Sequence, residues 1–129
     1  MKIGLCSGVF DDLHPGHEYF LTEAGKHCKL LIIGLNVDTS VRSLKGLGRP
    51  IYEFDKRAYA LDDWLQTNSC LISSIIPFDG DDWAFVRFFH PDVIIRGWDQ
   101  ALGISFNDIP IVRIDRGPLV STTYRAQGT

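Results

Sequence analysis

Apolar and polar positions alternate between two periods along the chain, and this alternation predicts strands and helices in turn. Short apolar runs, typical of strands buried on both faces of a parallel sheet, occur five times. The predicted strands are Ile3–Cys6, Lys29–Asn36, Cys70–Ile76, Val93–Ile95 and Ile109–Ile114. Four segments between them carry apolar residues at helical spacing. These predicted helices run over His14–His27, from a cap at Asp38 through Leu44, from Asp55 through Leu65, and from a cap at Asp81 or Asp82 through Phe89.

Five strands joined by helical crossovers predict an α/β fold. The expected architecture is a Rossmann-like, doubly wound, parallel five-stranded sheet in a single domain, residues 1–129. A length of 129 residues is enough for one compact domain and too short for two. Pro77 is expected to stop the third strand, and Pro110, at the start of the fifth, indicates an edge strand.

Polar turns follow the predicted strands at their carboxyl ends. In doubly wound sheets, ligands bind beyond these ends, at the point where the strand order reverses. A single cleft would require polar groups in all of these turns, but loops are polar in general, so this pattern leaves both interpretations open. The turns are Asn36–Asp38, Phe78–Gly80, Arg96–Asp99 and Asp115–Gly117.

Composition and charge exclude several classes of protein. Hydrophobic residues make up 45% of the chain and the mean hydropathy is +0.01, which is typical of a soluble domain. No run of apolar residues is long enough to span a membrane, and Met1–Gly4 lacks the pattern of a signal peptide, so a cytoplasmic location without a membrane partner is expected. Three widely spaced cysteines are expected to be free thiols, and a net charge of -3 argues against a nucleic-acid partner.

The candidate chemistry is concentrated in the stretch Gly8–His17, where the first strand gives way to a helix. Pro15 suits the first helical position, since its missing N–H would have no partner there. The unpaired N–H groups and the positive end of the helix dipole favour a bound phosphate. Gly16 leaves no side chain between His14 and His17, so ligand oxygens can approach the backbone. Two alternatives stay open: the histidines cap the helix for structural reasons, or they bind a metal, although no Cys/His cluster with zinc spacing completes such a site.

A second candidate segment follows the second predicted strand. Three basic residues, Arg42, Lys45 and Arg49, and two glycines lie within eight residues, and the glycine-rich loop runs from Lys45 to Pro50. This composition suits a mobile loop that folds over a polyphosphate. The alternative is a solvated charged surface.

The stretch from Gly8 to His17 resembles the G-x-F-D-x-x-H-x-G-H signature of the cytidylyltransferase-like nucleotidyltransferases, with every position present. Residues 36–51 are similar to the N-x-D-x-S-V-x-x-L-K-G-x-x-R-P-I pattern of the nucleotidyltransferase domain of ADP-heptose synthases. Arg116 with Ser121–Thr123 resembles a signature shared by the heptose and glycerol-3-phosphate enzymes. The likeness covers about residues 3 to 124.

The resemblance implies a role for each matching residue. His14, His17, Lys45 and Arg116 would form the catalytic set, contacting phosphates and stabilising the transition state. The nucleotide would be bound by Gly8, Val9, Phe10, Gly16, Arg96, Gly97, Asp99, Ser121, Thr122 and Thr123. The acceptor would be bound by Asp11, Asp38, Arg49 and Arg57.

The resemblance also implies a reaction. An acceptor phosphate oxygen would attack the α-phosphorus of a nucleoside triphosphate, and pyrophosphate would leave, with Mg²⁺ held mainly by substrate and water and no protein metal ligand assigned. ATP with heptose 1-phosphate is the first expectation, CTP with glycerol 3-phosphate the second, and ATP with riboflavin phosphate the third. A homodimer is expected from the family. A catalytically silent nucleotide-binding protein is the alternative from another class.

Departures from the family pattern lie near the carboxyl end of the chain. Leu119 and Arg125 replace a glycine and an isoleucine that flank the serine–threonine signature, and the stretch Ala101–Asn107 is short. These differences leave the identity of the acceptor open.

Overall fold

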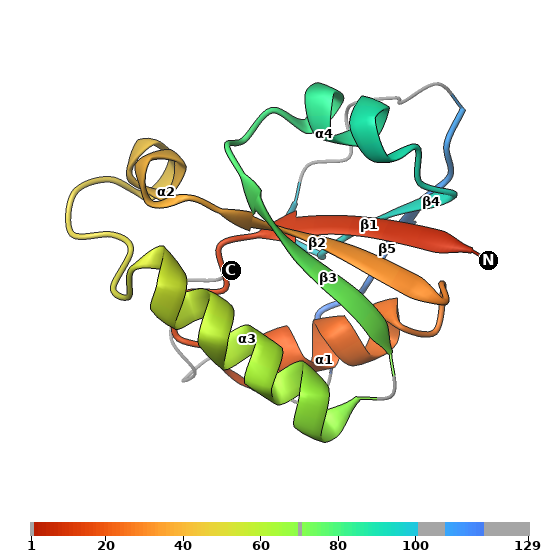
Figure 1. Ribbon diagram of the computed structural model, residues 1–129, viewed down its shortest axis with the longest axis horizontal. Helices are drawn as coiled ribbons and strands as arrows, with labels where there is room; N and C mark the ends of the chain where they lie inside the picture. The colour runs from red at the N-terminus through yellow and green to blue at the C-terminus, as the bar shows by residue number, and fades with distance from the viewer. Residues whose placement is uncertain (1, 70, 101–107, 118–129) are drawn as a thin grey trace.

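The computed structural model describes residues 2–69, 71–100 and 108–117. Within these ranges, strands and helices follow one another as the apolar pattern predicts (Figure 1). The strands are β1 (Ile3–Gly8), β2 (Leu30–Asn36), β3 (Ile72–Phe78), β4 (Val93–Arg96) and β5 (Ile111–Arg113). The helices are α1 (Pro15–Ala24), α2 (Asp38–Lys45), α3 (Phe54–Asn68) and α4 (Asp82–Phe89).

All neighbouring strands are parallel, and their order in the sheet is β3-β2-β1-β4-β5. The predicted Rossmann-like five-stranded sheet is therefore confirmed. The chain builds outward from β1 to β3 and then returns to place β4 on the other side of β1. The strand order thus reverses between β1 and β4, and the histidine turn leaves the carboxyl end of β1 at this switch point.

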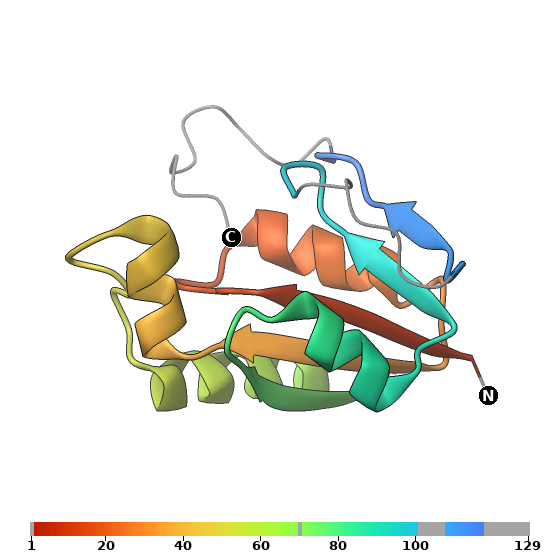
Figure 2. The ribbon, with the colours of Figure 1, turned by 90° about the horizontal axis from the view of Figure 1, so that it is seen from above.

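Helices cover both faces of the sheet, because alternate strand residues point to opposite sides. Leu31, Ile33 and Leu35 of β2 lie in one core cluster with residues of α1 and α3. Ile32, between them, lies in a second cluster with Phe85 of α4. Figure 1 shows α1 and α3 on one side of the sheet and α4 on the other, and Figure 2 shows α2 beyond the end of β2.

Three predicted boundaries are wrong, each for a local reason. Pro77 does not stop the third strand but lies inside β3, where it is the pairing partner of Leu35 in β2. A proline is tolerated there because β3 is an edge strand and needs no N–H on its outer side. Helix α1 ends at Ala24 rather than His27, with Gly25 as its C-cap. Helix α2 begins at Asp38, so Val37 is its N-cap, and no side chain caps it.

The other boundaries are confirmed within a residue or two, except that α3 continues three residues beyond Leu65 and ends at Asn68. Asp81 caps α4 by accepting a hydrogen bond from the Ala84 N–H at 3.0 Å. The fifth strand begins after Pro110 and lies at the edge of the sheet, as that proline indicates.

Gly34 of β2 is predicted to resist any side chain. A Cβ at this position would lie 2.8 Å from a ring carbon of Phe85, which is itself packed against Phe78 at a ring-centroid distance of 4.9 Å. Gly34→Ala is therefore expected to destabilise the domain by about 1–3 kcal/mol through overpacking. Urea unfolding measures the change, with Ser74→Ala at an exposed position of β3 as the control. Equal stability of both variants would contradict the tight packing of Phe85 on β2.

Candidate active site

The turn between β1 and α1 is held by the two histidines themselves. His14 is the N-cap of α1, and its Nδ1 accepts a hydrogen bond from the Gly16 N–H at 3.0 Å. His17 reaches back, and its Nδ1 accepts from the His14 N–H at 3.2 Å. Two imidazoles thus form a reciprocal capping box, the role that Ser and Glu more often share. The structural alternative for these histidines is in part correct, since both do cap the helix.

This capping defines which nitrogen of each ring carries the proton. Because each Nδ1 of His14 and His17 accepts a hydrogen bond, the proton of the neutral ring is on Nε2. Both Nε2 atoms are buried, and the rings stack with centroids 3.8 Å apart. The pair therefore carries two N–H donors beside the positive end of α1, where charge on a phosphate is stabilised.

The turn that precedes His14 has a strained backbone. Phe10 and Asp12 have φ values of 47° and 59°, in the left-handed region that residues other than glycine rarely adopt. The buried Phe10 ring lies 5.3 Å from the His17 ring. A Cβ on Gly8 would lie 2.9 Å from the Phe10 ring, so a glycine is needed there. Such strain is commonly retained at functional sites.

Asp11 ties the loop after α2 to this turn. Its buried carboxylate accepts hydrogen bonds from the Ile51 N–H at 2.6 Å and the Tyr52 N–H at 3.0 Å. The Arg49 guanidinium lies 3.5 Å from the same carboxylate. The basic loop is therefore anchored beside the histidines.

Lys45, at the end of α2, interacts electrostatically with charged residues near the switch point. Partial desolvation lowers the pKa of Lys45, and the nearby Arg49 lowers it further, while the Asp99 and Asp11 carboxylates oppose the shift. After Lys45 the loop passes through Gly46 and Gly48, with φ values of 92° and 87° and open space around both. This geometry lets the chain turn sharply without a side chain at either position.

The turn after β4 is held against the end of β1 by Gln100. Its Oε1 accepts from the Gly97 N–H at 2.7 Å, and its Nε2 donates to the Ser7 carbonyl at 3.1 Å. A Cβ on Gly97 would lie 3.3 Å from the Asp99 carboxylate and 3.9 Å from the Phe20 ring. Gly97 and Asp99 therefore lie at the switch point, where their predicted role requires them.

Arg116 packs against this turn. Its guanidinium lies over the Trp98 ring, 5.3 Å from the centroid. Next to it, the Tyr19 hydroxyl of α1 donates to the Asp115 carboxylate at 2.8 Å, and this bond raises the pKa of Tyr19. These contacts bring the segment after β5 to the amino-terminal half of α1.

A pocket of about 420 Å³, with several polar residues in its lining, opens at the carboxyl ends of β1 to β4, on the α4 side of the sheet. Arg96 lines it, is buried, and lies 3.5 Å from the Asp82 carboxylate. The predicted nucleotide residue Arg96 thus lies in this pocket, next to α4. The other polar lining residues are Ser7, Asn36, Ser40, Ser43, Asp79, Asp82 and Gln100. Sequence reasoning did not select these residues, although the polar turns at the strand ends were a signal for Asn36 and Asp79.

The structure brings most of the predicted site residues to one edge of the sheet. Asp38 and Arg57 pair with each other, with a carboxylate–guanidinium distance of 2.6 Å. Ser121, Thr122 and Thr123 lie outside the described residues, as do Leu119, Arg125 and Ala101–Asn107.

Among the described residues, no three or more His, Cys, Asp or Glu side chains gather in a way that could hold a metal ion. In the same part of the chain, no helix has the length and apolar character needed to cross a membrane.

Comparison with known proteins decides the family. Residues 5–116 match the cytidylyltransferase-like family. The chain belongs to that family. The predicted family is therefore confirmed. The prediction of a nucleotidyltransferase is confirmed as well, as the class of enzyme to which this family belongs.

Relatives of this cytidylyltransferase-like chain include bifunctional proteins named HldE. The chain is 38% identical to HldE of Caulobacter vibrioides over 103 residues, 79% of this chain, and 41% identical to that of Hyphomonas neptunium over 100 residues, 77% of this chain. Each match covers 20% of the relative, so the chain spans about a fifth of the length of these curated relatives.

Solved structures of similar shape agree with the fold. A lipopolysaccharide core biosynthesis protein from Thermoplasma volcanium GSS1 matches with a TM-score of 0.72 and 27% identity, over 91% of this chain and 98% of that one. A protein of unknown function from Archaeoglobus fulgidus matches with a TM-score of 0.75 and 20% identity, over 97% of each chain, and shows the fold alone.

Proposed function

We propose that this domain transfers the adenylyl group of ATP to a sugar phosphate such as heptose 1-phosphate and releases pyrophosphate. The observation that carries the proposal is the stacked histidine pair at the amino-terminal end of α1, in which both Nδ1 atoms accept backbone hydrogen bonds and both Nε2 atoms are buried. The choice of ATP and a heptose phosphate is supported by the similarity to HldE proteins and by the Asn36–Ile51 pattern.

In this mechanism the protein binds and orients the reacting groups. The Nε2–H groups of His14 and His17 donate to phosphate oxygens and stabilise the charge that builds on the leaving pyrophosphate. Lys45 and Arg116 bring further positive charge to the phosphates. No covalent intermediate with the protein is needed, because the acceptor phosphate oxygen attacks the α-phosphorus directly.

The acceptor sugar is proposed to enter the pocket beside α4. The serine hydroxyls and aspartate carboxylates that line this pocket suit the hydrogen bonds of a polyhydroxylated ligand. The Arg96 guanidinium suits the phosphate of that ligand. Mg²⁺ is proposed to bind through phosphate oxygens and water. Both Asp11 oxygens already accept hydrogen bonds from the backbone, so this carboxylate fits a structural role better than a metal ligand.

Pyrophosphate release tests the proposed function. The protein is incubated with Mg²⁺ and each of ATP, CTP, GTP and UTP against sugar 1-phosphates, glycerol 3-phosphate and riboflavin phosphate. Release with ATP and a heptose 1-phosphate would support the proposal. Release only with CTP and glycerol 3-phosphate would reassign the substrates. Binding of a nucleotide without release for any pair would favour a silent nucleotide-binding protein.

The lowered pKa of Lys45 predicts an alkaline limit to activity. The ammonium group is charged below its pKa, so kcat/KM for the triphosphate is expected to fall as pH rises through a value lower than that of an ordinary lysine. Lys45→Arg should move this limit to higher pH, because arginine stays charged. Asp99→Asn should move it to lower pH, because the Asp99 carboxylate raises the pKa of Lys45. An alkaline limit that neither variant moves would assign the titration to another group.

A further inference from the structure

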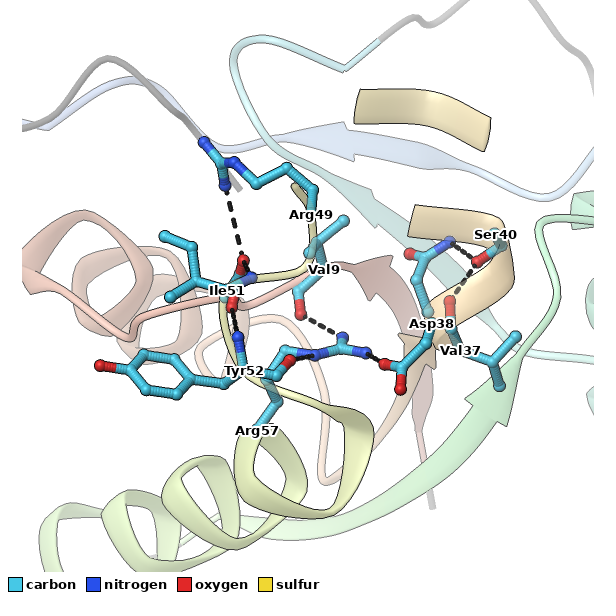
Figure 3. Close-up of polar contacts among 10 residues, drawn as sticks. Val9, Val37, Asp38, Ser40, Arg49, Ile51, Tyr52 and Arg57 are labelled. Carbon is cyan, nitrogen blue, oxygen red and sulfur yellow. Dashed lines mark hydrogen bonds and ion pairs between the residues drawn. The ribbon is translucent and has the colours of Figure 1, made fainter. Parts of the chain in front are cut away.

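A fully buried guanidinium joins three segments beside the site. Arg57, in α3, donates from Nη1 to the Val9 carbonyl at 2.9 Å and from Nε to the Tyr52 carbonyl at 2.9 Å. Its Nη2 lies 2.6 Å from the Asp38 carboxylate at the start of α2 (Figure 3). The guanidinium also lies 5.8 Å from the centre of the Phe54 ring. The side chain of Arg57 has 0% exposed surface, so its polar contacts are with protein groups.

These contacts connect parts of the chain that the proposed reaction must hold together. Val9 belongs to the turn that carries the histidines, and Asp38 begins the helix that ends at Lys45. Tyr52 lies near the carboxyl end of the basic loop, which joins α2 to α3, and its N–H donates to the Asp11 carboxylate. The loop is therefore anchored at its carboxyl end by two buried charged residues, while its glycine-rich tip has open space around it.

Burying a charge carries a large desolvation penalty, and removing one partner of a buried ion pair is strongly destabilising because the other charge is left uncompensated. The guanidinium presents donors on three separate nitrogens in one rigid plane, whereas a lysine carries its three donors on a single nitrogen and cannot reproduce this fork. The site itself gains from rigid support, because small displacements of groups that position a substrate reduce turnover strongly.

We propose that Arg57 is a positioning residue that sets the place of Lys45 and Arg49 relative to the histidine pair, rather than a residue that contacts the acceptor. It acts through Asp38 on α2 and through Tyr52 on the basic loop. The effect on turnover rests on the proposed function, whereas the effect on the loop does not.

The test compares Arg57→Lys and Asp38→Asn with the controls Arg87→Lys and Asp63→Asn, which alter exposed residues of α4 and α3. Asp38 is partly exposed, so its variant keeps the test possible if Arg57→Lys fails to fold. Amide hydrogen exchange is measured at Ile51 and Tyr52 and in β2. Then kcat and both KM values are measured with the substrate pair that the wild type uses.

Support for the proposal requires a local effect. In both variants the amides of Ile51 and Tyr52 should exchange at least fivefold faster while those of β2 are unchanged. The value of kcat should fall at least tenfold with each KM changed less than threefold, and the double variant should be no worse than the single ones, because the two residues act as a unit. The controls should match the wild type.

Three results would overturn the proposal. Faster amide exchange throughout β2 would indicate that Arg57 only stabilises the fold. A raised acceptor KM with unchanged kcat would indicate direct contact with the acceptor, and wild-type behaviour of both variants would exclude a positioning role. If the wild type turns over no substrate pair, the proposed function fails, and exchange at Ile51 and Tyr52 still decides whether Arg57 holds the loop.

Discussion

His14→Asn is expected to lower kcat about a hundredfold while helix α1 stays in place. Asparagine is among the best N-cap residues, so its side-chain oxygen can still accept from the Gly16 N–H as His14 Nδ1 does. What is lost is the Nε2–H donor, and removing one such donor to a developing charge costs on the order of 3 kcal/mol. The rate of pyrophosphate release with saturating substrates measures the change.

His90→Asn is the matched control. His90 is the C-cap of α4 in a left-handed conformation, φ 47°, which asparagine tolerates well, so its kcat should equal that of the wild type. A His14→Asn variant that turns over as fast as this control would show that the histidine only caps the helix. The domain would then bind nucleotides without the proposed donor pair.

Asp11→Asn is expected to cost about 1–3 kcal/mol of stability and to reduce turnover. The two carboxylate oxygens accept from different backbone N–H groups, those of Tyr52 and Ile51. An amide offers one oxygen and one NH₂ group, so one buried N–H would face another donor, and an unsatisfied buried group carries this penalty. The ion pair with Arg49 would also be lost. Urea unfolding measures the stability, with the midpoint shifted and the slope unchanged.

The control for this change is Asp63→Asn on the exposed side of α3, which should leave the unfolding midpoint within experimental error. If Asp11→Asn unfolds at the same urea concentration as the control, Asp11 does not hold the loop in solution. A normal midpoint with lost turnover would instead point to a direct contact between Asp11 and substrate.

The amino-acid sequence by itself determined the fold class and the family. Continuous apolar runs are typical of strands buried on both faces of a parallel sheet, and their alternation with helical segments favoured the doubly wound fold. The histidine stretch is local in sequence, and its ten residues define both the turn and the helix start. Its identification therefore needed no tertiary information.

Only the tertiary structure decided how distant residues share their partners. Pro77 continues β3 because that strand lies at the edge of the sheet, a fact that depends on strand order. The structure pairs Arg57 and Asp38, the two residues expected at the acceptor, with each other, and it places Arg96 in the lining of the pocket beside α4. Spacing in a sequence places residues on elements. The direction of a long charged side chain depends on which buried oxygen it can reach, and these oxygens come from segments far apart in the chain.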